Sequence, residues 1–198
     1  STDKIFVADD SSNNNPRVER FDTSLNSEDS VGLNSDSNTK YPDISDILYN
    51  KDSGNILAGG GARDKNKDSG QACYWTIDSS TMNQLSFYFN GNSPTYSSYS
   101  NLKYAGNGNA VAEFGNDYWR KFDISNGNNL EGFSTSGYGR DGSVSENYRY
   151  IIYDDDESNT YMNYLNEFPK ATNETIYHNS EQFDFVPTSV VLTNDVDN

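Results

Sequence analysis

The chain has few of the residues that carry nucleophilic catalysis or covalent cross-links. It contains one cysteine, Cys73, so no disulfide can form within it. Its one histidine, His178, has no serine or cysteine nearby in the sequence in the strained turn of a nucleophile elbow. The sequence therefore gives no support to a histidine-assisted nucleophile. It predicts that Cys73, next to Tyr74 and Trp75, is a small buried core residue.

Basic residues and long apolar runs are also scarce. Fourteen Lys and Arg face 30 Asp and Glu, giving a net charge of -16. This charge repels phosphate backbones and anionic membranes, so nucleic acid and membrane insertion are not expected. No apolar run approaches the roughly 18 residues of a membrane span. The carboxylates favour Ca²⁺, cationic partners or neutral sugars, or simply keep a secreted protein soluble.

What the chain does have is aromatic residues, with 15 Tyr, 10 Phe and 2 Trp. These side chains supply the apolar surface that disordered segments lack, so we expect a folded, aromatic core. The composition, rich in Asn, Ser and Tyr, and the sequon Asn173-Glu174-Thr175 indicate an extracellular or cell-surface location.

One short pattern recurs four times: an apolar residue, any two residues, a second apolar residue, then Asp or Asn. The copies are Val18 to Asp22, Tyr74 to Asp78, Trp119 to Asp123 and Met162 to Asn166. Each follows a short apolar segment, namely 4–9, 55–59, 109–114 and 150–154. A period of roughly 45 to 55 residues is typical of propeller blades, so the pattern predicts one strand of a repeated β unit.

Flanking segments complete the predicted unit. Outer strands are expected near 31–33, 84–89, 129–133 and 175–178, and innermost strands at 44–49, 99–104 and 144–150. The first copy lacks an innermost strand, and Ser189 to Thr193 can supply it. The sequence thus predicts an all-β fold in a single domain, a small four-bladed propeller closed by pairing of its terminal strands. The predicted repeats are 184–198 plus 1–35, 36–93, 94–137 and 138–183.

The chain resembles the β-propeller families. Ile5 to Asp10 and Arg17 to Asp22 are similar to the strand, loop and strand of NHL or YVTN repeats. Phe114 to Asp123 is similar to a haemopexin-type repeat, and four repeats is also the haemopexin count. The resemblance implies the fold and carries no site residue. A β-sandwich, or a filament in which the carboxy-terminal strand pairs with the next molecule, remains an alternative.

Acidic loops are the candidate metal sites. Asp64, Asn66 and Asp68 place oxygen-bearing side chains at alternate positions before Gly70, a spacing that lets a tight loop hold Ca²⁺. Asp9 and Asp154 end corresponding strands, so in a propeller their carboxylates could converge on one face. The alternative is that these residues form solvated turns. The triple glycine at 59–61 lacks the Lys-Ser/Thr ending of a phosphate loop and is predicted to be a turn that leaves a strand.

Aromatic rings are the candidate ligand-binding residues, because sugars stack on exposed Tyr and Trp rings. The candidates are Tyr96, Tyr99, Tyr118, Trp119 and Tyr138. Along a strand, Tyr118 and Trp119 point to opposite faces, so at least one of the two sets must pack between blades.

These observations favour an extracellular, non-catalytic module that binds a glycan or a surface protein, with Ca²⁺ as a possible cofactor. One alternative is a structural subunit of a filament, matrix or adhesin, which would self-associate. The other is a carbohydrate-active enzyme with paired carboxylates, for which no spacing marks a pair.

Overall fold

The computed structural model describes residues 3–9, 16–37, 39–64, 70–89, 98–114, 118–134, 139–155 and 159–165. The chain divides into two units, residues 1–166 and 167–198, and every strand named below lies in the first. In the described residues, strands and turns make up all the regular structure, and no helix is long and apolar enough to cross a membrane.

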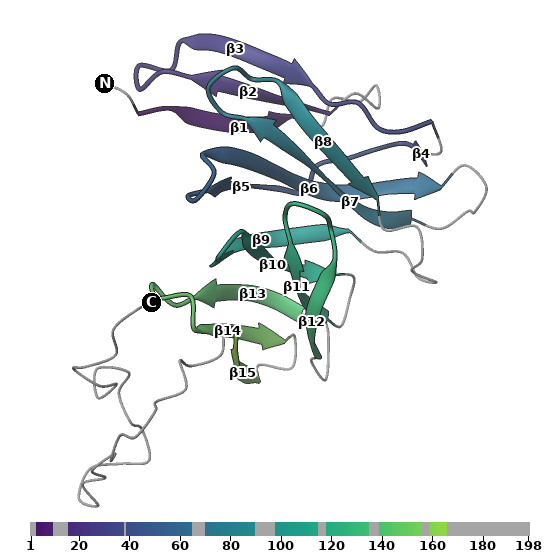
Figure 1. The fold of residues 1–198 in the computed structure, drawn as a ribbon, viewed down its shortest axis with the longest axis vertical. Helices are drawn as coiled ribbons and strands as arrows, with labels where there is room; N and C mark the ends of the chain where they lie inside the picture. Colours follow the sequence, from purple (N-terminus) through teal and green to yellow (C-terminus); the bar gives the residue numbers. More distant parts are fainter. Residues whose placement is uncertain are drawn as a thin grey trace, which may run out of the picture. The chain divides into compact units, whose positions relative to one another are not determined.

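The strands form four antiparallel sheets that follow one another along the chain (Figure 1). The first sheet contains β1 (Ile5–Asp9), β2 (Arg17–Phe21) and β3 (Ser27–Gly32). The second contains β5 (Asp46–Asn50), β6 (Asn55–Asp64), β7 (Gly70–Asp78) and β8 (Gln84–Phe89), with β4 (Thr39–Lys40) paired to the far end of β6. The third contains β9 (Tyr99–Gly106), β10 (Asn109–Phe114), β11 (Tyr118–Asp123) and β12 (Asn129–Ser134). The fourth contains β13 (Gly139–Val144), β14 (Tyr150–Asp155) and β15 (Thr160–Tyr164).

The core lies in three apolar clusters, one between each pair of successive sheets. Val18 and Leu33 pack against Trp75 between the first and second sheets. Tyr74 and Phe122 belong to the cluster between the second and third sheets. The last cluster joins the third sheet to the fourth. A sandwich has one core between two sheets, whereas successive sheets packed face to face are the blades of a propeller. The predicted all-β, propeller-type fold is confirmed; the proposed closing strand, 189–193, lies outside the described residues.

Strand β7 shows how the sequence produces this packing. Its side chains alternate between the two faces of the sheet, so Ala72 and Tyr74 join one cluster while Cys73, Trp75 and Ile77 join the other. Residues Gly70 to Ile77 are all buried. The prediction that Cys73 is a buried core residue is confirmed, and burial raises the pKa of its thiol.

The Asp that ends the recurring pattern forms a turn after β2, β7 and β11. The Oδ1 atoms of Asp22, Asp78 and Asp123 each accept, at 2.8 Å, the backbone N–H of the serine two residues later. Each turn then contains a residue in the left-handed region, namely Leu25 (φ 63°), Met82 (φ 53°) and Gly127 (φ 73°). The recurring Asp is therefore a turn-forming residue, because its short side chain bonds its own backbone. The fourth copy ends at Asn166, outside the described residues.

These turns predict an acid-sensitive stability. Hydrogen bonds, first from the Ser80 hydroxyl, lower the pKa of Asp78 to about 2, and the pKa values of Asp22 and Asp123 are also lowered. The unfolded chain then binds more protons between about pH 4 and pH 2, so stability is present above this window and lost as the pH falls through it. We expect the melting temperature of D78N to fall less than that of the wild type on acidification from pH 5. Thermal unfolding at several pH values measures this.

Asp154→Asn is the control for that prediction. Asp154 is exposed, and its side chain accepts no turn hydrogen bond in the described part of the chain. Its substitution should leave the acid-induced fall in melting temperature unchanged. Identical pH profiles for D78N and the wild type would contradict a contribution from the turn.

Two local predictions were wrong. The triple glycine lies within β6 and not in a turn, and all three glycines are buried. A Cβ atom at Gly60 would lie 2.0 Å from the carbonyl oxygen of Asp43, so close passage of another segment explains this glycine. The innermost strand expected at 144–150 is instead β13, which ends at Val144, followed by a turn.

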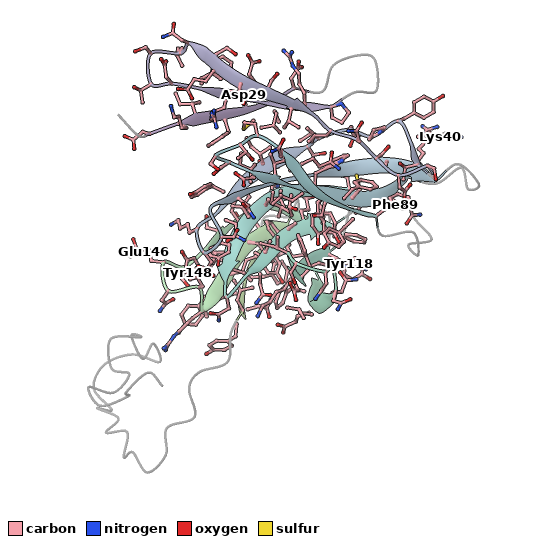
Figure 2. The ribbon with its side chains drawn as sticks, turned by 45° about the horizontal axis from the view of Figure 1, so that its top comes forward. Asp29, Lys40, Phe89, Tyr118, Glu146 and Tyr148 are labelled. Carbon is pink, nitrogen blue, oxygen red and sulfur yellow. The ribbon has the colours of Figure 1, made fainter. Side chains whose placement is uncertain are left out.

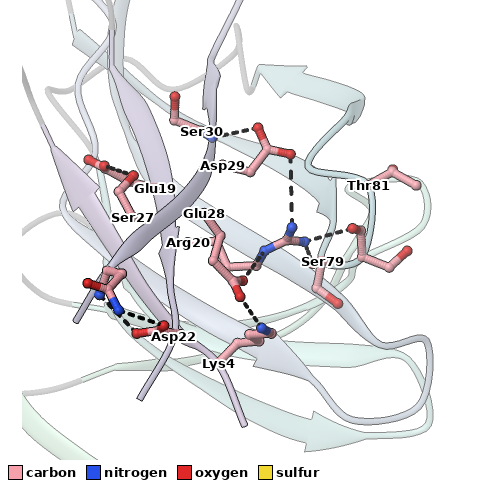
Figure 3. Close-up of polar contacts among 12 residues, drawn as sticks. Lys4, Glu19, Arg20, Asp22, Ser27, Glu28, Asp29, Ser30, Ser79 and Thr81 are labelled. Atoms are coloured by element: carbon pink, nitrogen blue, oxygen red, sulfur yellow. Dashed lines mark hydrogen bonds and ion pairs between the residues drawn. The ribbon is translucent and has the colours of Figure 1, made fainter. Parts of the chain in front are cut away.

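Arg20 connects the first sheet to the second (Figure 3). Its Nε donates to Glu28 Oε2 at 3.1 Å, and its Nη2 lies 4.0 Å from Asp29 Oδ2. Its Nη1 donates to the carbonyl oxygens of Ser79 (2.9 Å) and Ser80 (2.7 Å), which belong to the turn between β7 and β8. One guanidinium therefore joins the outer strand of one sheet to a turn of the next.

Candidate functional site

The short hairpin turns lie together at one end of the sheets. Each sheet alternates direction strand by strand, so the turns after β2, β5, β7, β9, β11 and β13 share one end. Cross-sheet hydrogen bonds support this: Gly108 N donates to Asp52 Oδ2 between the turns after β9 and β5, and Arg20, near the end of β2, donates to the Ser79 and Ser80 carbonyls in the turn after β7. Residues 10–15, 65–69, 90–97, 115–117, 135–138 and 156–158 lie outside the described residues.

A cleft of about 600 Å³ opens at this turn end, between the second and third sheets. We call it the turn cleft. Its lining comes from the turns after β5, β9 and β11 and from the adjoining strands: Asn50, Asp52, Ser53, Asn55, Ile56, Leu57, Thr76, Ser86, Tyr88, Asn107, Gly108, Asp123, Ile124 and Ser125. This volume is within the roughly 300–1,000 Å³ of small-ligand pockets.

Interlocking contacts hold the walls of the turn cleft. The Tyr74 hydroxyl donates to the Ile124 carbonyl at 3.1 Å, and the Tyr74 and Tyr88 rings stack at 4.8 Å. On the other wall, Asp52 accepts the Gly108 N–H at 3.2 Å. Burial, and then the hydrogen bond with Asp52, raises the pKa of Tyr104, behind this wall, to about 12. The cleft is thus formed by side chains that are already fixed, which favours binding without rearrangement.

Two side-chain amides in the turn cleft remain available. Asn55 and Asn107 both line it, and no hydrogen bond from either side-chain amide is found within the described ranges. Asn107 is exposed and has a left-handed φ of 53°, in the two-residue turn between β9 and β10. A side-chain amide has both a hydrogen-bond donor and an acceptor, so these two residues can donate to a ligand hydroxyl or accept from it.

The charge of the turn cleft is negative. Asp52 and Asp123 line it, and its lining contains no Lys or Arg. The Ser125 hydroxyl donates to Asp123 at 2.7 Å and holds the pKa of that carboxyl below its usual range, against the opposing effect of burial. Asp123 is therefore suited to accept hydrogen bonds at neutral pH and poorly suited to act as a general acid, which requires a raised pKa.

The predicted aromatic ligand-binding residues do not form one site. Tyr99 is 2% exposed and Trp119 is 0% exposed, so the core holds both rings and no sugar can stack on them; this corrects their assignment. Tyr118 is 47% exposed but begins β11, and Figure 2 shows it at the opposite end from Tyr148, which lies among the turns. Tyr96 and Tyr138 lie outside the described residues.

The predicted metal ligands are described only in part. Asn66, Asp68 and the side chain of Asp64 lie outside the described residues. Asp9 ends β1 and accepts a hydrogen bond from Arg17 Nε at 3.0 Å, while Asp154 lies near the end of β14 and is exposed. Within the described ranges, no three Asp, Glu, His or Cys side chains are grouped around a possible metal position. A Ca²⁺ site stays a prediction.

The residues of the turn cleft were not predicted as a site. Asp52-Ser53-Gly54 and Gly106-Asn107-Gly108 have the composition of ordinary turns. The available signal is that both follow innermost strands of consecutive repeats, which places them at the same end of neighbouring blades. Tyr88, on an outer strand, gives no such signal.

The chain was compared with protein families, curated proteins and solved structures. No protein-family model matches the chain, and no curated protein matches it. Among solved structures, the chain is similar to one described as "Structure of Dos1 propeller", with 13% sequence identity and a TM-score of 0.49. The match covers 85% of this chain and 53% of that one, so the chain spans about half the length of that propeller protein.

Proposed function

We propose that this chain is an extracellular, non-catalytic module that binds a glycan in the turn cleft. The observation that carries the proposal is the lining of the cleft. It combines two carboxylates and the ring of Tyr88 with the amides of Asn55 and Asn107, which have no hydrogen-bond partner among the described residues. Amide and carboxylate groups around an aromatic ring are suited to a sugar. Each sugar hydroxyl both donates and accepts a hydrogen bond, and the apolar face of the sugar ring can stack on the aromatic ring.

Electrostatics favour a neutral sugar unit in this cleft. The lining carries two carboxylates and no cation, so an anionic group would be repelled there. The same lining could attract Ca²⁺, which some sugar sites use to hold hydroxyl pairs. The lowered pKa of Asp123 supports binding over hydrolysis, because a glycosidase acid must be protonated at working pH.

The first test is a glycan and polysaccharide binding screen of the purified chain, run with millimolar Ca²⁺ and again with EDTA. Binding under both conditions supports a metal-independent site, and loss in EDTA supports the predicted Ca²⁺. No binding under either condition would overturn the glycan proposal.

Asn107→Gly is the variant that links binding to the turn cleft. Glycine tolerates the left-handed backbone of residue 107, so the fold should stay intact while the amide is lost. We expect affinity for the glycan found in the screen to fall about tenfold, the effect of roughly one good hydrogen bond. Calorimetric titration measures it.

Asn101→Gly is the matched control. Asn101 also has a left-handed φ, of 51°, and lies on β9 outside the lining of the turn cleft. The Asn101→Gly variant should bind the glycan with the affinity of the wild type. Equal losses in both variants would show that binding does not use the turn cleft.

A second candidate function, a self-associating structural subunit, is supported by the outer face of the fourth sheet. Ile152, Met162 and Tyr164 on this face are 48%, 49% and 55% exposed. Ile152 is directly opposite Met162 in the pairing of β14 with β15, so the two form a contiguous apolar patch. A sedimentation coefficient that rises with protein concentration, and falls back in I152K, would favour this function over a monomeric glycan-binding module.

A further inference from the structure

A second cavity of about 600 Å³ lies on the other side of the turn between β5 and β6. It is formed at the turn end by the innermost strands β5, β9 and β13. We call it the lysine pocket, lined by Leu48, Tyr49, Lys51, Lys103, Tyr104, Ser143, Val144, Ser145, Glu146 and Tyr148. Figure 2 shows Glu146 and Tyr148 close together at this end of the molecule.

Lys51 and Lys103 differ from most of the other cations that the structure describes. Lys4, Arg17 and Arg20 form ion pairs, Lys121 donates to the Leu165 carbonyl, and Arg120 lies over the Phe114 ring. Within the described residues, Lys51 and Lys103 take part in no ion pair or hydrogen bond, and both line the same cavity. In a chain of net charge -16, two unpaired ammonium groups at one place create a local site for an anion.

The formal charge of the lysine pocket fits a monoanion. Two lysines and Glu146 give +2 - 1 = +1. A single carboxylate would neutralise this charge, whereas a phosphate monoester carries about two negative charges at neutral pH and would exceed it. The lining thus favours a monoanion over a phosphate.

The remaining lining can take the body of a sugar. Tyr49 is 50% exposed, and Ser143 adds an exposed hydroxyl. The back wall is held in place, because the Tyr104 and Tyr148 rings meet edge to face at 5.3 Å. Tyr148 also has a left-handed φ of 57°, and its ring lies where a Cβ of Gly106 would be 3.0 Å away.

The turn between β5 and β6 is shared by both cavities. Asn50 and Asp52 line the turn cleft, while Lys51, between them in the sequence, lines the lysine pocket. Adjacent residues of one turn therefore line two neighbouring cavities, one with a negative and one with a positive formal charge. A chain of sugars that crosses this turn would place a neutral unit on one side and an acidic unit on the other.

We infer that the lysine pocket binds the carboxylate of a hexuronate unit, with Lys51 and Lys103 as its donors, so that the glycan recognised by this chain is an acidic polysaccharide. This inference rests on the proposed function, because it assigns the charged unit of the same ligand.

The test compares D-glucuronate with D-glucose, which share a ring and differ in the carboxylate. Binding is followed by NMR titration of the wild type, Lys51→Met, Lys103→Met and the control Lys40→Met. Methionine keeps the apolar stem of lysine and removes its charge. Each pocket variant should weaken glucuronate binding about tenfold, the effect of one charge-assisted hydrogen bond, and glucuronate affinity should fall as NaCl rises. Lys40, whose ammonium group lies 6.0 Å from the Tyr41 ring centroid, is outside the pocket and should have no effect.

The outcomes separate this inference from the proposed function. Neutral glycans that bind through Asn107, together with glucuronate that binds no better than glucose, would overturn the hexuronate assignment and leave the proposed function in place. Suppose that glucuronate binding depends on the two lysines, while Asn107→Gly leaves the affinity for the glycan found in the screen unchanged. This result would support the lysine pocket and count against the turn cleft. Inorganic phosphate that competes as well as glucuronate would show a general anion site and overturn selection of a carboxylate.

Discussion

Replacing Trp119 with alanine is expected to lower the free energy of unfolding by about 3–5 kcal/mol. Trp119 is 0% exposed and lies in the cluster that joins the third sheet to the fourth, with Ile151, Tyr153 and Leu165. Its ring centroid lies 5.8 Å from that of Tyr153. Alanine would leave a large cavity between two sheets whose backbones cannot close it. Urea unfolding followed by fluorescence or circular dichroism measures the loss.

The close fit around Trp119 contributes to this loss. A Cβ atom at Gly142 would lie 2.5 Å from the indole, so the strand of the fourth sheet approaches the ring directly. One feature opposes the loss: the indole N–H is buried and has no hydrogen-bond partner among the residues that the structure describes. Removing it relieves a desolvation cost of about 1–3 kcal/mol. Trp119→Phe, which loses that N–H and keeps a ring, should therefore be much milder than Trp119→Ala.

Tyr118→Ala is the control, because Tyr118 is the preceding residue in β11 and is 47% exposed. Its removal should change the free energy of unfolding by about 0.5 kcal/mol or less. If Trp119→Ala were as stable as the wild type and lost glycan binding, the ring would be a ligand platform and the assignment to the core would be wrong.

Gly60→Ala is expected to cost more than 3 kcal/mol or to prevent folding, at the upper end of overpacking effects. The new Cβ would lie 2.0 Å from the Asp43 carbonyl oxygen and 2.8 Å from its carbon, and both are backbone atoms. No side-chain rotation can relieve this overlap. The segment before β5 would have to leave β6, breaking the bonds from Asp43 N to Gly61 O and from Ser45 N to Gly59 O, both 2.8 Å. Soluble yield and urea unfolding measure the effect.

Gly132→Ala is the matched control for that substitution. Gly132 also lies in a strand, β12, and a Cβ there would meet nothing within 4 Å. Alanine should be neutral or slightly stabilising, since it restricts the unfolded chain. Equal stability of Gly60→Ala and Gly132→Ala would show that residues 43–45 do not pass closely over β6.

The strand that precedes each copy of the recurring pattern is readable from the sequence alone. The apolar segments at 4–9, 55–59, 109–114 and 150–154 correspond to β1, β6, β10 and β14. The recurring Asp also has a local cause, because an Asx turn depends on residues two to four positions apart. Such features need no knowledge of the rest of the fold, which explains why the repeat could be predicted.

The triple glycine shows where local reasoning fails. Glycine marks turns often enough that a turn was the natural prediction, yet the structure places residues 59–61 in β6. The cause is Asp43, whose carboxyl Oδ1 accepts the Gly61 N–H at 2.6 Å. Nothing in the sequence shows that a segment 18 residues earlier passes over this strand.

The sequence by itself determined the propeller class, the turn-forming Asp residues and the opposite orientations of Tyr118 and Trp119, because alternation and turn chemistry depend on near neighbours. The tertiary structure alone decided which faces are covered, which amides meet in the turn cleft and that Lys51 and Lys103 share one pocket. Burial and convergence are set by neighbouring sheets, whose residues lie some 50 positions away in the sequence, as Lys51 and Lys103 do. Local sequence patterns thus determine the strands and turns of each sheet, whereas contacts between sheets determine which residues line the two cavities.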